Sequence, residues 1–260
     1  MKSDLSTTRS LSLGLLGVLF FTTQASFAAT TNLYGNYVGT SVTYANVRES
    51  SGTDGLPLFG APGISGNTLT FDPTFTANAA GAGGLDITDG QLNMGIVAAP
   101  GNVIPSVNFA ELGDFHLLGP MSANTFVEVS ATFFIRILKV DGVSINPVVL
   151  TDKMTFAPSA NGHFDHATFS GLGNFWSGSF NFDVNNALTL AGIHFINGAT
   201  ELSIGLDNTL AAVSEAGTVA FIAKKISDAV TITVPQVPEP SIFALTLCGA
   251  GFLFARRPRR

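Results

Sequence analysis

Hydrophobic and polar residues alternate along much of the chain between residues 31 and 234, and a period of two predicts β-strands. The clearest stretch is Thr125–Val140, whose even-numbered positions include Glu128 and Arg136. Its odd-numbered positions are hydrophobic: Val127, Val129, Ala131, Phe133, Ile135 and Ile137. This pattern predicts a strand with one face in the core and the other at least partly in solvent.

A tight turn is expected directly after this strand. The dipeptide Asp141-Gly142 tolerates the positive φ angles of a type I′ turn, so we expect a hairpin into Val143–Ile145. Pro147 has no backbone N–H to donate to a partner strand, and pairing should therefore end close to it.

Shorter alternating stretches occur along the rest of the chain, and no segment sustains the spacing of an amphipathic helix. The expected strands are residues 180–184, 202–206 and 230–234, with Tyr37–Val47, Thr68–Phe71, Gln91–Val97 and Thr218–Ala223 as further candidates. About ten short strands without crossover helices predict an all-β fold, either an antiparallel β-sandwich or a jelly-roll. We expect one domain over residues 29–235. The Gly- and Ala-rich stretch 77–84 is interpreted as a long loop, with a linker between two smaller units as the alternative.

The first 28 residues have the pattern of a secretory signal peptide. Lys2 and Arg9 precede the apolar run Leu11–Phe21, and Ser26-Phe27-Ala28 places small residues at the two positions that signal peptidase reads. We expect cleavage after Ala28. An uncleaved anchor is the less favoured alternative, because an 11-residue apolar run is too short to span a bilayer.

The last residues contain three features in a fixed order. Pro238, Glu239 and Pro240 are expected to form an extended, non-helical segment, because proline disfavours helix both at its own position and at the residue before it. An uncharged stretch, about 241–255, then predicts a short transmembrane helix. Four arginines follow and should stop transfer with the C-terminus in the cytoplasm: Arg256, Arg257, Arg259 and Arg260.

This order of features closely resembles the PEP-CTERM sorting signal of Gram-negative bacteria, also known as the ice-binding protein C-terminal domain. The resemblance covers residues 236–260 and does not extend to the body of the chain. It implies that Pro238, Glu239 and Pro240 are recognised by an exosortase, a membrane-embedded transpeptidase-like enzyme. It also implies export across the inner membrane, a membrane-anchored precursor, and delivery to the cell surface or the exopolysaccharide matrix of a biofilm. The alternative is a plain C-terminal membrane anchor.

Removal of both ends changes the charge and cysteine content. Residues 29–237 keep 6 of the 12 Lys and Arg residues and 16 of the 18 Asp and Glu residues, a net charge near −10. Such a surface repels phosphate backbones, so nucleic acid is not an expected partner. Cys248, the only cysteine, lies in the tail, and the exported body therefore has no disulfide.

Aromatic residues offer one candidate ligand-binding position. The chain has 22 Phe, 3 Tyr and 1 Trp, a composition typical of a core without disulfides. Phe175 and Trp176 are neighbours, and in a strand they would point to opposite faces, so at most one of them could face solvent. Trp176 is the candidate for stacking on a sugar ring, although packing in the core is the favoured interpretation.

Candidate metal ligands are scattered. His163-Phe164-Asp165-His166 is the densest group, but no third ligand is identifiable, and a solvated turn is the favoured interpretation. His116 and His194 are isolated and interpreted as structural. Aspartates in the turn-like segments 86–90, 183–186 and 207–208 do not match an EF-hand loop. We therefore expect no cofactor and no specific metal site, with structural calcium bound by remote loops as the alternative.

Short catalytic motifs are missing from the sequence, which contains no Gly-x-Ser-x-Gly elbow, no His-Glu-x-x-His segment and no phosphate-binding glycine loop. The leading hypothesis is accordingly a non-enzymatic, exported protein with a structural or adhesive role in the matrix. A carbohydrate-binding module with extracellular polysaccharide as partner is the second hypothesis. A secreted glycoside hydrolase or lyase is the third, with Glu128 and Glu201 as the first carboxylates to test.

Overall fold

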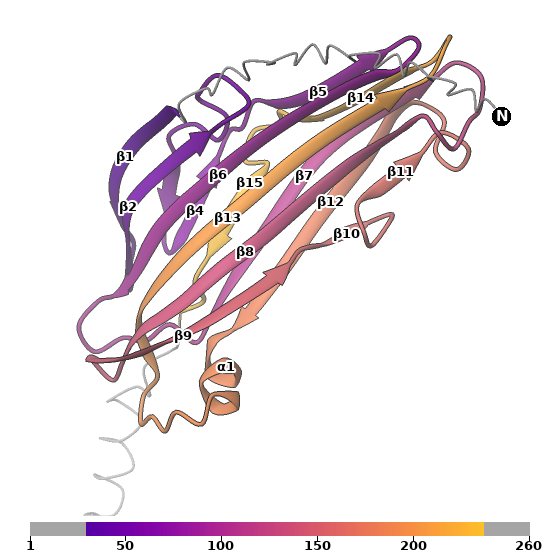
Figure 1. Ribbon diagram of the computed structural model, residues 1–260. Helices are drawn as coiled ribbons and strands as arrows, with labels where there is room; N and C mark the ends of the chain where they lie inside the picture. Colours follow the sequence, from indigo (N-terminus) through magenta and orange to yellow (C-terminus); the bar gives the residue numbers. More distant parts are fainter. Residues whose placement is uncertain (1–29, 237–260) are drawn as a thin grey trace, which may run out of the picture.

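The computed structural model describes residues 30–236, and its regular elements are fifteen β-strands and one short helix. The strands form two antiparallel sheets that pack face to face, with most of the long strands running along the length of the molecule (Figure 1). The expectation of an all-β, antiparallel fold is confirmed, and the two layers have the arrangement of a sandwich.

The first layer is a seven-stranded sheet with the order β1-β2-β6-β13-β8-β11, in which β9 also pairs with β8. Its strands are β1 (Thr30–Val38), β2 (Val42–Ser51), β6 (Gly84–Ala98), β8 (Phe126–Val140), β9 (Val143–Lys153), β11 (His163–Asp165) and β13 (Ala199–Ser214). The long strand β13 lies at its centre and pairs with β6 on one side and β8 on the other.

The second layer is an eight-stranded sheet with the order β10-β12-β7-β15-β4-β3, joined by β14 and β5. Its strands are β3 (Gly63–Ser65), β4 (Thr68–Phe71), β5 (Phe75–Ala80), β7 (Ser106–Leu118), β10 (Thr155–Ala157), β12 (Gly171–Asp183), β14 (Val219–Lys224) and β15 (Val230–Thr233). One edge of β7 pairs first with β15 and then with β14, so these two short strands lie end to end along it.

Strand β8 and its hairpin follow the sequence pattern closely. All six odd-numbered hydrophobic residues of Thr125–Val140 are buried, and Asp141 and Gly142 both have positive φ angles, as a type I′ turn requires. The expected end of pairing at Pro147 is wrong, because β9 pairs with β8 as far as Lys153. A register shift lies between Ser144 and Val148 of β9, and this irregularity accommodates the proline on a strand whose other edge is unpaired in the described part of the chain.

Three further expectations need correction. Residues 37–47 form parts of two strands, because the chain turns at Gly39, where the N–H donates to the carbonyl of Val42. The stretch 77–84 is no long loop: it contains the end of β5, a short turn and the start of β6. A helix, α1 (Val184–Leu190), follows β12, and Asp183 caps it by accepting the backbone N–H of Asn186 at 2.9 Å.

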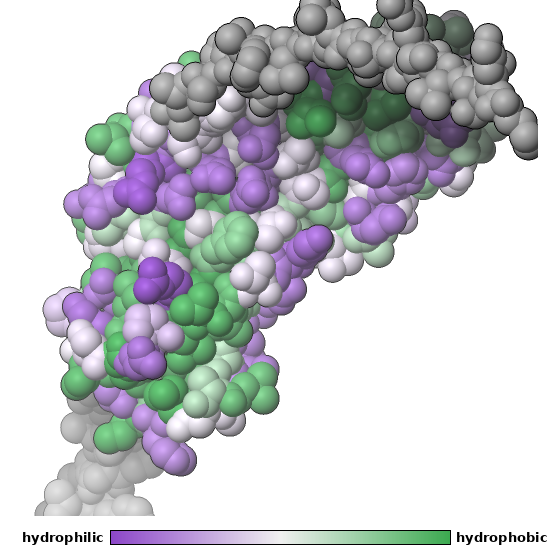
Figure 2. Space-filling model, viewed as in Figure 1, coloured by the Kyte–Doolittle hydropathy of each residue, from purple (hydrophilic) through white to green (hydrophobic). Residues whose placement is uncertain are grey.

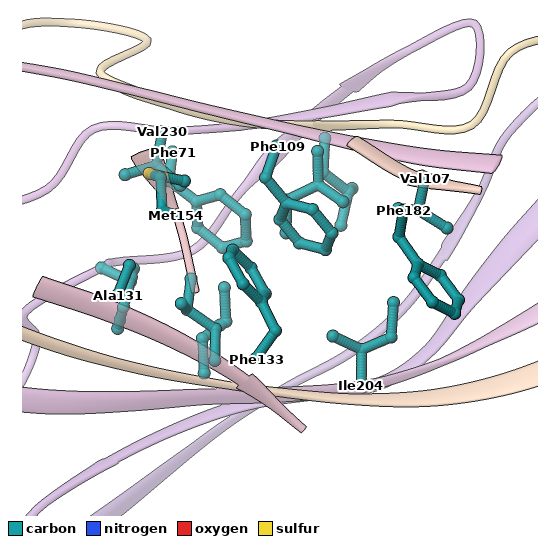
Figure 3. Close-up of a cluster of buried hydrophobic side chains, with 14 of the residues drawn as sticks. Phe71, Val107, Phe109, Ala131, Phe133, Met154, Phe182, Ile204 and Val230 are labelled. Carbon is teal, nitrogen blue, oxygen red and sulfur yellow. The ribbon is translucent and has the colours of Figure 1, made fainter. Parts of the chain in front are cut away.

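The core lies between the two sheets and is rich in phenylalanine. Phe109 of β7 faces Phe133 of β8 across the interface, with ring centroids 4.5 Å apart (Figure 3). Phe180 of β12 stacks on the same Phe133 ring at 4.3 Å. Aromatic burial on this scale supplies hydrophobic stabilisation without a cystine bridge.

Several predicted features lie outside the described residues. These are the signal peptide 1–28 with its cleavage site at Ala28, the motif Pro238-Glu239-Pro240, the helix at about 241–255, Cys248, and the four terminal arginines. Within residues 30–236, no helix has the length and hydrophobicity needed to cross a membrane.

Candidate functional site

The structure separates the two aromatic neighbours of β12. Trp176 is only 2% exposed and packs edge-on against Phe156, with ring centroids 6.0 Å apart. Gly113 on β7 makes room for the indole, because a Cβ atom at that position would collide with the Trp176 ring. Phe175 points the other way and is 68% exposed. The ring face that a sugar could reach therefore belongs to Phe175 and not to Trp176.

Polar and aromatic side chains lie near Phe175 on the outer face of the eight-stranded sheet. Phe175 is paired in register with Asp114, whose carboxylate is 3.3 Å from the imidazole of His116. The Nδ1 atom of His116 accepts the backbone N–H of Gly173 at 2.9 Å, and its ring stacks on Phe221 at 5.4 Å. An exposed ring beside a carboxylate and an imidazole can offer both stacking and hydrogen bonds to a polar ring-shaped ligand.

Glu128 lies on the outer face of the seven-stranded sheet. Its carboxylate is 2.7 Å from Nδ1 of His163, which β11 places directly opposite it in register. The pair borders a hollow of about 150 Å³ that is also lined by Asn161 and Thr209. Glu128 is thus held by an imidazole at the rim of a small depression.

Glu201 lies near the end of the molecule that carries α1. Its carboxylate accepts a hydrogen bond from Lys139 at 2.7 Å, beside a hollow of about 530 Å³. Asp141 helps to shape this hollow by accepting three backbone N–H groups from residues 196–198, at 2.7–3.0 Å. These hydrogen bonds lower the pKa of the Asp141 carboxyl. Figure 2 shows this side of the molecule, where polar side chains form a band across the strands and hydrophobic ones gather toward the α1 end.

The register of the sheet keeps Glu128 and Glu201 far apart. Glu128 pairs with Ala211 of β13, and Ala211 lies ten residues along the strand from Glu201. At about 3.3 Å per residue the separation is roughly 33 Å. The two carboxyl groups of a glycosidase lie about 5–10 Å apart. These two glutamates therefore cannot act as one catalytic pair.

The aspartates in the segments 86–90 and 207–208 belong to strands and not to turns. Asp89 of β6 and Asp207 of β13 project from neighbouring strands, and burial together with the Asp89 carboxylate raises the pKa of Asp207. Thr209 donates to Asp89 at 2.8 Å. Two carboxylates supply only part of the six to eight oxygens that calcium takes. In the described part of the chain, no three His, Cys, Asp or Glu side chains come together in a metal-binding arrangement.

The histidines of the 163–166 segment lie on opposite sides of the chain. His163 faces outward toward Glu128, whereas His166 is buried. The backbone N–H of His166 donates to the carbonyl of Thr125 at 2.8 Å, which extends the pairing of β11 with β8. Residues 163–165 thus form a strand, and His166 begins a turn but is buried, so the interpretation as a solvated turn is wrong. The two imidazoles do not converge on a common ligand.

Three polar side chains interact with one another in the core, and we call them the lysine cluster: Lys224, Glu111 and Asn208. These side chains are 0%, 1% and 0% exposed. The Lys224 Nζ atom donates to Oε2 of Glu111 at 2.8 Å and to Oδ1 of Asn208 at 2.7 Å. The amide nitrogen of Asn208 donates to the other oxygen of Glu111. Each polar side chain thus contacts the other two.

Aromatic rings enclose the lysine cluster. The Nζ atom of Lys224 lies 4.8 Å from the ring centroid of Phe75, 5.8 Å from that of Trp176 and 5.9 Å from that of Phe59. These distances are within the range of cation–π attraction. Burial lowers the pKa of Lys224, and the Glu111 carboxylate acts in the opposite direction.

A second buried carboxylate, Glu49 of β2, positions one of these rings. It accepts the backbone N–H groups of Leu58 and Phe59 at 3.1 and 2.6 Å, and the hydroxyl group of Tyr34. Burial and this carboxylate raise the pKa of Tyr34. The contacts hold the loop between β2 and β3 against the core, where the Phe59 ring meets Phe75 with centroids 4.8 Å apart.

Sequence reasoning missed the lysine cluster, although the alternation contained a signal. Glu111 shares the core-facing parity of Phe109 and Phe115. Asn208 likewise follows Leu206 on the buried side of β13, and Lys224 follows Ile222 on the buried side of β14. A polar residue in a core-facing row has to find a partner, because an unpaired buried polar group is costly.

Neither a protein-family model nor a curated protein matches the chain. Among solved structures, it is similar to TmCBM61 in complex with β-1,4-galactotriose, with 8% identity, a TM-score of 0.20, and coverage of 59% of this chain and 70% of that one. It is also similar to the family 11 xylanase from Neocallimastix patriciarum, with 9% identity, a TM-score of 0.19, and coverage of 74% and 99%.

Proposed function

We propose that the chain is a non-enzymatic exported protein that its PEP-CTERM-like tail delivers to the cell surface or the exopolysaccharide matrix of a Gram-negative bacterium. Signal peptidase and an exosortase are its processing partners. The β-sandwich then acts as a disulfide-free structural or adhesive body.

The observation that carries this proposal is that the core is closed before the tail begins. Val234 is buried, its N–H donates to the carbonyl of Asn67 at 3.2 Å, and its own carbonyl accepts from the Asn67 side chain at 3.2 Å. The Pro-Glu-Pro motif starts four residues later, at Pro238. A processing cut at the motif would leave these hydrogen bonds of Val234 and Asn67 in place, so the body could stay folded after the tail is removed.

Deletion of residues 238–260 tests the sorting role. We expect the truncated chain to keep the β-sheet circular dichroism of the full chain and to remain in the periplasm, as measured by cell fractionation and surface labelling. Glu239→Gln should reduce delivery, whereas Ser241→Ala, just outside the tripeptide, serves as the matched control. Surface delivery that is unchanged by the deletion would refute the proposal.

A second candidate function, polysaccharide binding, is favoured by the exposed Phe175 ring beside Asp114 and His116. Phe175→Ala should weaken retention on a polysaccharide column made from the producing strain's own matrix. Phe134→Ala is the control, because Phe134 is an exposed ring on the other sheet. Equal retention of both variants and the parent chain would exclude this face as the binding site.

A further inference from the structure

We propose that Lys224 and Asn208 react with each other to form an intramolecular amide bond, with Glu111 as the catalytic residue. The bond would join β14 of the eight-stranded sheet to β13 of the seven-stranded sheet through the middle of the core. It is a covalent modification that goes beyond the proposed function and does not depend on it.

The geometry places the nucleophile beside its target. Lys224 Nζ is 2.7 Å from Oδ1 of Asn208. Because a C=O bond is about 1.23 Å long, the carbon Cγ of that amide lies no more than about 3.9 Å from Nζ. Reacting atoms held at about 3–3.5 Å gain a large advantage from proximity, so a small displacement brings this pair to reacting distance. The lysine and asparagine project from packed strands, which limits their other orientations.

The surroundings favour the neutral amine that such a reaction needs. Charged groups are strongly disfavoured in a low-dielectric interior, and the 2.8 Å contact between Nζ and Glu111 provides a path for one proton to leave the ammonium group. The lowered pKa of Lys224 acts in the same direction. The rings of Phe59, Phe75 and Trp176 shield the cluster from water, which would otherwise compete as a nucleophile.

The reaction balances without any other reagent. Glu111 takes a proton from the Lys224 ammonium group, and the Nζ lone pair then attacks Cγ of Asn208 to form the new C–N bond. The bond from Cγ to Nδ2 breaks, and Nδ2 receives a second proton from Nζ through Glu111 and leaves as ammonia. The third proton of Nζ stays on the new amide. Glu111 ends as the neutral acid, positioned to donate a hydrogen bond to the product.

The product also relieves an electrostatic cost. Burial of an ion pair requires desolvation of both charges, and the attraction between the charges often does not offset that unfavourable free energy. Conversion of the ammonium, the carboxylate and the primary amide into a secondary amide and a neutral acid removes both charges from the core. The body contains no cysteine, because Cys248 lies in the tail. The amide would therefore connect the two sheets covalently where no disulfide can form.

Peptide mapping of the purified full chain tests the proposal. The protein is denatured and digested with a protease that cuts after glutamate, since Glu215 lies between the two residues. Without a link, the peptide 202–215, which contains Asn208, separates from the peptide that begins at residue 216 and contains Lys224. We expect them to remain joined as one branched peptide whose mass is lower than the sum of the two by one molecule of ammonia.

Variants identify the chemistry. Glu111→Gln keeps the size of the side chain but cannot accept a proton from the ammonium group, so the two peptides should be recovered separately from a chain that retains β-sheet circular dichroism. Asn208→Asp should give a linked peptide of the same mass as the parent, because loss of water from the acid yields the same amide. Glu201→Gln, at the exposed pair, should leave the link between residues 208 and 224 intact.

Recovery of the two separate peptides from the folded parent chain, with Asn208 and Lys224 unmodified, would overturn the proposal. The cluster would then be a permanent ion pair. The parent chain alone decides this outcome, whether or not a variant folds.

Discussion

Among residues 30–236, two lysine–glutamate pairs have nearly equal N···O distances but opposite environments. Lys139 and Glu201 are 2.7 Å apart on the outer face, with side chains 43% and 27% exposed, whereas Lys224 and Glu111 are 2.8 Å apart with side chains 0% and 1% exposed. Water solvates the first pair and leaves it a weak contact. Around the second pair, aromatic rings take the place of water, and every polar atom depends on its neighbours in the cluster.

The comparison shows that the N···O distance alone does not determine how much an ion pair contributes to stability. The exposed pair can break with little consequence, because water replaces each partner. If the buried pair loses one member, the other is left charged in a medium that cannot solvate it. The same need for a partner holds the lysine against the asparagine amide, and contact of this kind is what makes a reaction between them feasible.

The largest effect is expected from Glu111→Ala, which leaves Lys224 without its carboxylate. The variant also lacks the carboxylate that the proposed amide formation needs, so Lys224 stays buried and unpaired. We expect the free energy of unfolding to fall by at least about 3–5 kcal/mol, the usual cost of breaking a buried pair. Urea denaturation at neutral pH measures it. Glu201→Ala is the matched control at the exposed pair, and an equal loss in both variants would contradict the distinction between them.

Glu49→Ala should have the next largest effect. The backbone N–H groups of Leu58 and Phe59 both donate to Oε2 of Glu49, so removal of the carboxylate leaves both without their acceptor. We expect a loss of about 1–3 kcal/mol in the free energy of unfolding. Because this loop carries Phe59 toward the lysine cluster, hydrogen exchange of residues 52–62 should quicken as well. Unchanged exchange there would show that Glu49 does not hold the loop.

A smaller, pH-dependent effect is expected at Asp141. Hydrogen bonds from three backbone N–H groups lower the folded-state pKa of this carboxyl, so the stability it contributes is present above the unfolded pKa, about 3.9, and is lost as pH falls through the folded value. Asp141→Asn should therefore lower stability at pH 7 and flatten its decline in acid. Asp152→Asn is the control, since that side chain accepts only the N–H of Lys153. Parallel pH profiles for the parent and Asp141→Asn would refute this role.

The smallest effect is expected at the exposed pair. Lys139→Met should change the free energy of unfolding by about 0.2–1 kcal/mol, and the difference should shrink further in high salt, which screens surface charges. Urea titrations at low and high ionic strength measure it. A loss as large as that of Glu111→Ala would place the pair in a far less solvated environment than its exposure indicates.

Sequence alternation predicted the strands best where one face is buried. Strand β8 begins one residue from the expected start, and β4 has the predicted bounds. The failures have physical causes. Pro147 lies in an irregular part of β9, which an alternation with period two cannot reveal. The sequence around Phe175 and Trp176 does not show which ring is buried, because the space for the indole comes from Gly113 on another strand.

The lysine cluster depends on register between strands that are distant in sequence. Glu111 lies 97 residues from Asn208 and 113 from Lys224, so no short motif joins the three. The alternation of inward and outward positions shows only that each of the three is a polar residue facing the core. It indicates that each needs a polar partner, but not which residue that partner is.

Fragmentation of the intact, exported protein in a mass spectrometer tests the central claim most directly, namely that the core lysine is a reactive group and not a buried copy of the surface pair. Cleavage of single backbone bonds between residues 208 and 224 should release no separate fragments, because the amide link holds both sides together, and the total mass should be low by one ammonia. A continuous series of fragments through residues 208–224, with both side chains unmodified, would contradict the account.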